Sequence, residues 1–154
     1  MPPPARTPIG LALARTARTA SRAFDEALVA AGGSLPVWLI LLTLQTRELG
    51  NQRELAEAVG IRGATLTHHL NAMETDGLVT RRRDPANRRI QHVELTLAGE
   101  ALFRQLAGAA LAFDQRLRAG LDDHDVDVLD GLLGRLHANI TDGPEAAAAA
   151  GPGH

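Results

Sequence analysis

The sequence predicts a mainly α-helical fold with one small β-hairpin, and three observations support this prediction. Apolar residues recur every three to four positions through most of the chain, which is typical of amphipathic helices. Between Leu78 and Leu95 the period falls to about two, and the turn-forming run Asp84-Pro85-Ala86-Asn87 interrupts it. Two short helices separated by a glycine precede this hairpin, so residues 34–96 have the order of a winged helix-turn-helix.

Composition favours a single domain over residues 1–154, because a chain that is 45% hydrophobic at this length can bury a modest core. Cysteine is absent, which excludes disulfides and thiol catalysis. No apolar run approaches the roughly 20 residues of a membrane helix, and the N-terminal MPPPART lacks the hydrophobic region of a signal peptide. We therefore expect a cytoplasmic protein with no membrane partner.

The first helix is expected over residues 8–31, with Thr7 as its cap and Pro8 as its first residue. A pair of glycines ends it. Ser34 then caps a second helix that ends near Thr46. Because this second helix is apolar on most sides, we expect it to form the buried centre of the domain.

The helix-turn-helix begins at Asn51, which forms a predicted capping box with Glu54. Gly60 ends that helix, since glycine adopts the left-handed conformation without strain. The second helix, Gly63–Asp76, has a buried stripe of Leu66, Leu70 and Met73. Its other face consists of short or polar side chains, which are either merely solvated or able to contact base edges in a major groove: Ala64, Thr65, Thr67, His68 and Asn71.

The hairpin is predicted to pair strands at residues 78–83 and 88–95, and arginines gather around it. They are Arg81, Arg82, Arg83, Arg88 and Arg89. The chain carries a net charge of −2, yet residues 94–154 hold ten of its acids and only four of its arginines, so the acids concentrate toward the C-terminal end. A phosphate-lined groove explains such a cluster, with Arg53 and Arg88 as phosphate contacts. For Arg81 to Arg83 the alternative is a role in strand solubility.

Beyond the hairpin, Thr96 is expected to cap a helix from Leu97 to about Ala119, and Asp122 or Asp123 to begin another. Both helices are amphipathic, and residues 8–31 and 97–140 together carry more apolar surface than a small winged domain can cover. Burial against a second copy would satisfy them, so we expect a homodimer. Residues 141–154 lack caps and periodicity and are expected to be disordered.

Two segments resemble the MarR (multiple antibiotic resistance regulator) family of transcription factors. They are LNAMETDGLVTRR, at the end of the recognition helix, and DPANRRIQHVELTLAGEALF, through the wing. The resemblance implies a symmetric DNA-binding dimer whose wing arginine, Arg89, enters a minor groove. Asn87 departs from the aspartate that usually orients this arginine, and Arg62 replaces a common capping serine; Arg62 remains a candidate DNA contact.

MarR-like proteins often bind a small aromatic acid or phenol between their DNA-binding and dimerisation helices. The resemblance therefore suggests an effector pocket with Trp38 and His69 as walls and Arg22 as the partner of a carboxylate. Trp38 and His69 have an alternative role as ordinary core residues.

No enzymatic activity is expected, because the chain lacks a serine elbow, a phosphate loop and a Glu/His zinc motif. His68 and His69 are adjacent on a helix and point about 100° apart, so they do not chelate one metal ion. We expect no metal and no cofactor. The prediction is a homodimeric repressor that a ligand releases from a pseudo-palindromic operator. Activation or the absence of an effector remains open, and the alternative is a protein-interaction module without DNA binding.

Overall fold

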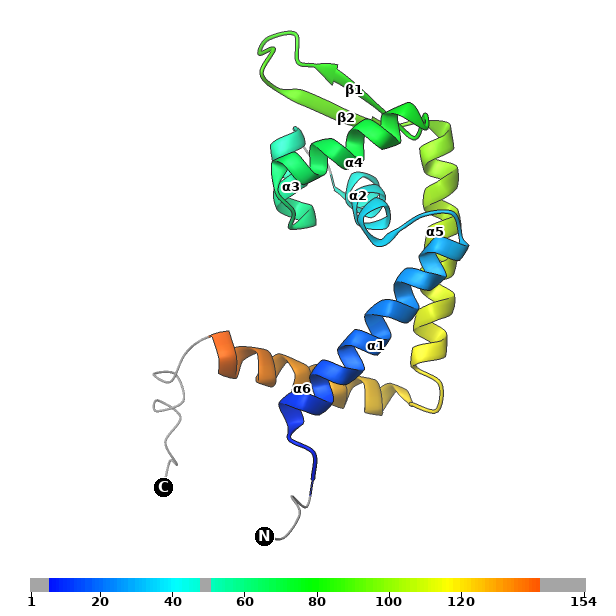
Figure 1. Ribbon diagram of the computed structural model, residues 1–154, viewed down its shortest axis with the longest axis vertical. Coiled ribbons are helices and arrows are strands. Elements are labelled where there is room, and N and C mark those ends of the chain that lie inside the picture. Colours follow the sequence, from blue (N-terminus) through cyan, green and yellow to red (C-terminus); the bar gives the residue numbers. More distant parts are fainter. Residues whose placement is uncertain (1–5, 48–50, 142–154) are drawn as a thin grey trace. The chain divides into compact units, whose positions relative to one another are not determined.

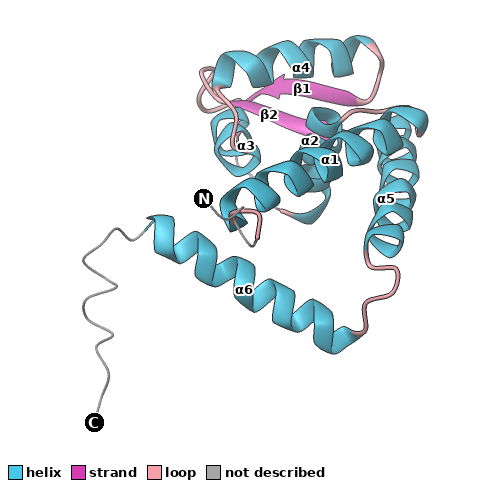
Figure 2. Cartoon of the chain, turned by 60° about the horizontal axis from the view of Figure 1, so that its bottom comes forward, coloured by secondary structure: helices cyan, strands magenta, loops and turns pink. Residues whose placement is uncertain are grey.

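The computed structural model describes residues 6–47 and 51–141. Its elements are α1 (Ile9–Ala30), α2 (Leu35–Thr46), α3 (Gln52–Val59), α4 (Gly63–Thr75), β1 (Val79–Arg83), β2 (Gln91–Leu95), α5 (Leu97–Leu117) and α6 (Asp123–Thr141) (Figure 1). The chain divides into two compact units, Met1–Phe113 and Asp114–His154. The predicted fold class, mainly helical with one antiparallel hairpin, is confirmed (Figure 2).

Side-chain caps set the starts of α2 and α3, but not the start of α1. Ser34 caps α2 by accepting a hydrogen bond from the Val37 backbone N–H, and Asn51 caps α3 through the Glu54 N–H, as predicted. The cap predicted at Thr7 is wrong: Pro8 occupies that position and Ile9 is the first helical residue. Proline has no side-chain acceptor, so α1 begins without a side-chain cap; the Pro8 carbonyl accepts hydrogen bonds from the Leu11 and Ala12 N–H groups.

Helix α2 forms the centre of the first unit, as its composition predicted. It contacts α1, α3, α4 and β2. Trp38, Ile40 and Leu41 are its buried residues, and the Trp38 ring stacks on Phe103 of α5 with centroids 5.6 Å apart. The predicted stripe of α4, Leu66, Leu70 and Met73, completes this core together with Val79 of β1. The inner face of α4 is therefore packed into the core, and this packing fixes the position of the polar face that carries the DNA-binding candidates.

The hairpin is shorter than predicted. Val79 pairs with Leu95 and Arg83 with Gln91, so β2 begins three residues later than the expected start at Arg88. The reason is the conformation of residues 84–90, where the Asp84 carboxylate accepts hydrogen bonds from the Ala86 and Asn87 backbone N–H groups. These bonds fold the chain into a local turn, which removes Arg88 and Arg89 from the strand ladder.

A close backbone contact joins the hairpin to α5. Thr96 caps this helix by accepting from the Gly99 N–H, and its own backbone N–H donates to the carbonyl of Leu78. A Cβ atom added at Gly99 would lie 2.0 Å from that same carbonyl oxygen. Only glycine fits here, so the first turn of α5 lies directly against Leu78, which connects α4 to β1.

In the second unit, Asp122 caps α6. Its carboxylate accepts from the Asp125 N–H, and the Asp125 carboxylate accepts from the Asp122 N–H, which makes a reciprocal capping box. No residue of α6 is buried in the single chain. The predicted disordered tail began at residue 141, but Thr141 is still helical; the remaining residues, 142–154, lie outside the described part of the chain.

Among the described residues, no single helix is long and apolar enough to cross a membrane. Helices α1 and α2 meet that standard only as a pair, with a bend of 76° between them.

Candidate nucleic-acid interface

The outer face of α4 presents the polar side chains that the sequence predicted. Ala64, Thr65, His68 and Asn71 are exposed, while Thr67 is half-buried. Arg62 occupies the N-cap position and is exposed, but its side chain makes no capping hydrogen bond. This leaves the first backbone N–H groups of α4 without a side-chain acceptor at the cap, as the loss of the usual serine implied.

Thr67 is held by a residue that the sequence reasoning missed. Gln52, the first residue of α3, donates from Nε2 to the Thr67 hydroxyl at 2.9 Å, and this hydroxyl donates to the Gly63 carbonyl at 2.9 Å. The hydroxyl proton is therefore already in use, and Thr67 offers its methyl group more readily than a hydrogen bond. The Gln52 Oε1 atom is buried and has no partner. A glutamine at the start of the helix before the recognition helix was the available signal.

At the base of the wing, Arg81 connects β1 to α4. Its guanidinium donates to Glu74 through Nε at 2.9 Å and Nη2 at 2.6 Å, and Nη2 also lies 2.6 Å from Oδ1 of Asn71. The Arg81 side chain is only 17% exposed. The alternative of strand solubility is therefore wrong for Arg81. Arg82 pairs with Glu94 at 2.6 Å, but both side chains are more than half exposed.

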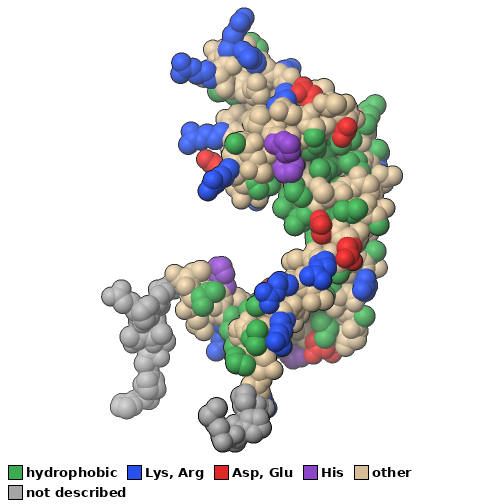
Figure 3. Space-filling model, viewed as in Figure 1, with side chains coloured by type: hydrophobic (Ala, Val, Ile, Leu, Met, Phe, Trp, Pro, Cys, Tyr) green, Lys and Arg blue, Asp and Glu red, His purple; other side chains and the backbone are tan. Residues whose placement is uncertain are grey.

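At the tip of the wing, the backbone is organised while the arginines remain free. Asn87 accepts a hydrogen bond from the Arg89 backbone N–H through its Oδ1 atom. The Arg88 and Arg89 side chains are exposed, and no described residue forms an ion pair or hydrogen bond with either guanidinium. Figure 3 shows basic side chains extending from the hairpin and from the neighbouring helices of the same face. Unpaired guanidiniums of this kind are suited to phosphate oxygens.

A carboxylate and a histidine brace this tip. The His92 Nε2 atom lies 2.9 Å from Oδ2 of Asp84, while the other carboxylate oxygen accepts the two backbone N–H groups of the turn. The hydrogen bond with His92, followed by those with Asn87 and Ala86, lowers the pKa of Asp84 below its ordinary 3.8. Asp84 is thus a carboxylate at neutral pH, and both of its oxygens serve as hydrogen-bond acceptors in the tip turn.

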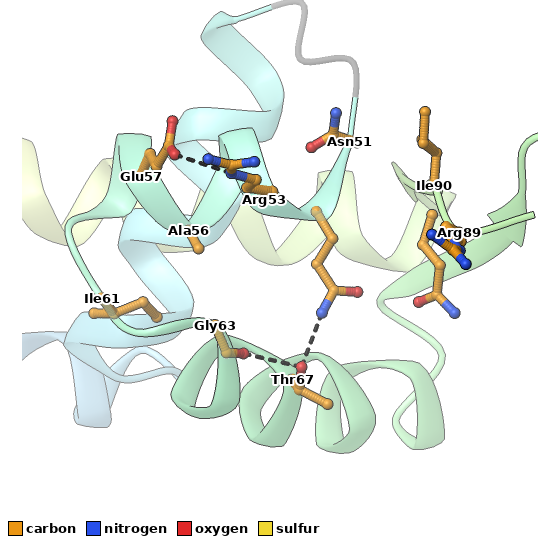
Figure 4. Close-up of a pocket in the computed structure, with 11 residues that line it drawn as sticks. Asn51, Arg53, Ala56, Glu57, Ile61, Gly63, Thr67, Arg89 and Ile90 are labelled. Carbon is orange, nitrogen blue, oxygen red and sulfur yellow. Dashed lines mark hydrogen bonds and ion pairs between the residues drawn. The ribbon is translucent and has the colours of Figure 1, made fainter. Parts of the chain in front are cut away.

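A groove of about 730 Å³ opens between the N-terminal ends of α3 and α4 and the start of β2. Figure 4 shows Thr67 and Gly63 on one side of it and Arg89 and Ile90 on the wing side. Arg53, also on its rim, forms an exposed ion pair with Glu57 at 3.4 Å. Such a pair exchanges easily for a phosphate contact because both side chains are well solvated.

The three candidates for an effector pocket have different environments. Trp38 is 9% exposed and belongs to the core, where it stacks on Phe103. His69 is half-buried, and its ring lies edge-on to His68 with centroids 5.7 Å apart. Arg22 is exposed on α1. None of these three residues lines the groove between α3, α4 and the wing. Within residues 6–47 and 51–141, no group of three His, Asp or Glu side chains is placed to hold a metal ion.

The fold and this face define a winged helix-turn-helix protein, and comparisons with known proteins agree. Residues 34–91 match the model of the MarR family. The transcriptional regulator PA3341 is similar, with 29% identity, a TM-score of 0.68, and coverage of 88% of this chain and 100% of that protein. The transcriptional repressor CouR bound to a 23-mer DNA duplex is also similar, at 26% identity and a TM-score of 0.75, covering 84% of this chain and 92% of CouR.

CouR from Rhodococcus jostii RHA1 bound to p-coumaroyl-CoA matches as well, at 26% identity and a TM-score of 0.67, over 83% of this chain and 90% of CouR. The resemblance predicted from the sequence is confirmed: residues 34–91 match the MarR family model, and the chain is similar to transcriptional regulators of known structure.

Proposed function

We propose that this protein is a homodimeric, sequence-specific DNA-binding repressor that a small aromatic or phenolic ligand releases from a pseudo-palindromic operator. The observation that carries the DNA-binding part is the pair of unpaired guanidiniums at the wing tip, Arg88 and Arg89, beside the exposed polar face of α4. The similarity to CouR, which was solved on DNA, supports the same conclusion. The proposed contacts are Arg53, Arg62, Ala64, Thr65, Thr67, His68, Asn71, Arg88 and Arg89.

The dimer is supported by apolar surface that the single chain leaves uncovered. In α6, Leu129, Leu132 and Leu133 are 47%, 48% and 40% exposed, and Ile9 of α1 is 67% exposed. Burying a fully exposed side chain of this kind contributes about 1.5–3 kcal/mol, and covering the part that is still exposed here contributes a fraction of that per residue, so a second copy is a favourable partner. A two-fold axis would place two α4 helices in successive major grooves roughly 34–36 Å apart. Residues 8–31 and 97–140 are the proposed dimerisation helices.

Ligand release needs only that the ligand bind one arrangement of the dimer better than the other. The similarity to CouR supports an aromatic ligand, since CouR was solved with p-coumaroyl-CoA. Arg22, Trp38 and His69 remain the proposed pocket residues. The sole tryptophan, Trp38, gives a direct reporter, because an aromatic ligand that stacks beside it should quench its fluorescence.

The test is fluorescence anisotropy with labelled DNA from upstream of the protein's own gene, against scrambled competitor and across a salt series. A dimeric repressor should bind with competitor resistance, and the logarithm of its affinity should fall linearly with the logarithm of salt concentration. Light scattering gives the oligomeric state, with Leu133→Asp as the disrupting variant and Asp130→Asn as the matched control. If the protein binds neither this DNA nor any member of a genomic fragment library specifically, the protein-interaction module is favoured instead.

Added p-coumaroyl-CoA should lower the measured DNA affinity and quench Trp38. If no aromatic acid or thioester changes the DNA affinity, the ligand-release part of the proposal is wrong and the DNA-binding repressor still stands.

A further inference from the structure

The Asn71 side chain has one fixed orientation on the recognition helix. Its amide is held by Arg81, whose Nη2 atom lies 2.6 Å away. A guanidinium has only hydrogen-bond donors, so the Asn71 atom that faces it must be the oxygen. Chemistry therefore assigns the amide: Oδ1 is directed to Arg81, and Nδ2 is the atom left for other partners.

The arginine that imposes this orientation is itself well held. Glu74 lies one turn after Asn71 on α4 and accepts two hydrogen bonds from the same guanidinium. Arg81 is 17% exposed, and its strand is part of the hairpin ladder, where Arg81 pairs with Val93. Charge-assisted bonds to two acceptors in a half-buried place are stronger than ordinary neutral ones. Rotation of the Asn71 amide would put its NH₂ group against a cation, which is repulsive.

Asn71 itself is exposed, and no described residue accepts a hydrogen bond from its Nδ2 atom. Asparagine usually recognises adenine by donating to N7 and accepting from N6 at the same time. That pairing needs a free Oδ1 atom. Here Arg81 already donates to this oxygen, so the adenine amino group would compete with a cation for it.

We propose that Arg81 is a positioning residue that makes Asn71 a hydrogen-bond donor toward DNA, so that Asn71 selects base edges rich in acceptors. This inference rests on the proposed DNA-binding function. Guanine presents N7 and O6 and thymine presents O4 in the major groove, whereas cytosine presents its N4 amino group there. At the contacted base, guanine or thymine is favoured, adenine is less favoured, and cytosine is disfavoured.

The neighbouring Thr67 sharpens this assignment. Its hydroxyl proton is used by the Gly63 carbonyl, and its oxygen accepts from Gln52. One turn along the same helix, Asn71 keeps two unused amide hydrogens. The half-buried threonine therefore does not substitute for Asn71 as a donor, and a change at position 71 should alter base preference directly.

The experiment is selection of duplexes from a randomised DNA library by the full-length protein, followed by sequencing. Asn71→Asp keeps an oxygen for Arg81 but removes the NH₂ group, so its preference at one position of each half-site should move from guanine or thymine toward cytosine or adenine, by about ten-fold. Arg81→Met keeps a long apolar side chain but frees the amide, so adenine should gain several-fold. The control Arg82→Met changes the adjacent, exposed arginine and should keep the wild-type preference.

The outcomes separate the two proposals. If the wild-type protein enriches no sequence, the proposed function fails and this inference fails with it. If the wild type enriches a motif that Asn71→Asp leaves unchanged, the donor role of Asn71 is overturned while DNA binding stands. If Arg81→Met weakens binding or folding with no change in base preference, Arg81 is only structural. Should Arg81→Met not fold, Arg81→Leu, which also lacks a hydrogen-bond donor, serves in its place with the same expected gain of adenine.

Discussion

The base and the tip of the wing contain the same residue type in opposite situations. At the base, Arg81 and Arg82 are each paired with a glutamate, Glu74 and Glu94. At the tip, Arg88 and Arg89 have no acidic partner among the described residues. The difference shows that the arginine cluster is not one uniform basic patch: the base arginines join the hairpin to itself and to α4, and the tip arginines are available to a ligand.

Backbone geometry accounts for this division. Alternate residues of a strand point to opposite faces, so Arg81 is directed at α4 while Arg82 lies on the other face beside Glu94. The tip has no such neighbour, because the Asp84 turn ends the ladder before Arg88.

The largest effect should come from Arg89→Ala at the tip. This change should lower DNA affinity roughly ten-fold or more for all sequences and reduce the salt slope by about one, because one counterion-releasing contact is lost. Thermal stability should not change. Anisotropy across a salt series measures it, with Arg82→Ala as the matched control. If the Arg89→Ala protein bound DNA as tightly as the wild type, the wing tip would not be part of the DNA-binding surface.

Arg81→Ala should act on stability instead. It removes two hydrogen bonds to Glu74 and one to Asn71 from a half-buried position, which should lower the free energy of unfolding by about 1–2 kcal/mol. The loss is small because Glu74 is 42% exposed and regains water as its partner. Chemical denaturation followed by Trp38 fluorescence measures this loss. An unchanged unfolding midpoint would make the base and tip arginines equivalent.

The brace between Asp84 and His92 should make wing stability depend on pH. The pKa of Asp84 is lower in the folded protein than its ordinary 3.8, so the stabilisation is complete above that value. It is lost as pH falls through the folded pKa, when the carboxyl group takes up a proton. Thermal melts from pH 6 downward should show the difference between wild type and Asp84→Asn narrowing at the acid end. A constant difference would contradict this role.

The smallest effect should come from Arg82→Ala. Its ion pair with Glu94 is short, but the two side chains are 72% and 53% exposed. Solvent-exposed pairs contribute about 0–1 kcal/mol, and salt weakens them further. Denaturation in low and high salt should give nearly the same midpoint for variant and wild type. A loss comparable to that of Arg81→Ala would show that exposure does not separate the two base arginines.

Much of the fold could be predicted because its signals are local. Ser34, Asn51 and Asp122 cap their helices by bonds to residues three positions on, and Gly60 has the positive φ that ends α3. The start of β2 could not be predicted this way, because alternation of residue types continues past the point where the Asp84 turn breaks the ladder. The role of Gln52 and the pairing of Arg81 with Asn71 could not be predicted for a similar reason, since their partners lie 15 and 10 residues away.

By itself, the sequence determined the order of helices and hairpin, the apolar stripe of α4, and the presence of arginines around the wing. These properties depend on periodicity, turn chemistry and charge, which neighbouring residues already contain. Only the tertiary structure decided which arginines are paired and which way the Asn71 amide is turned. Those properties depend on distances between side chains from different elements, and a hydrogen bond exists only where folding brings donor and acceptor within about 3 Å of each other.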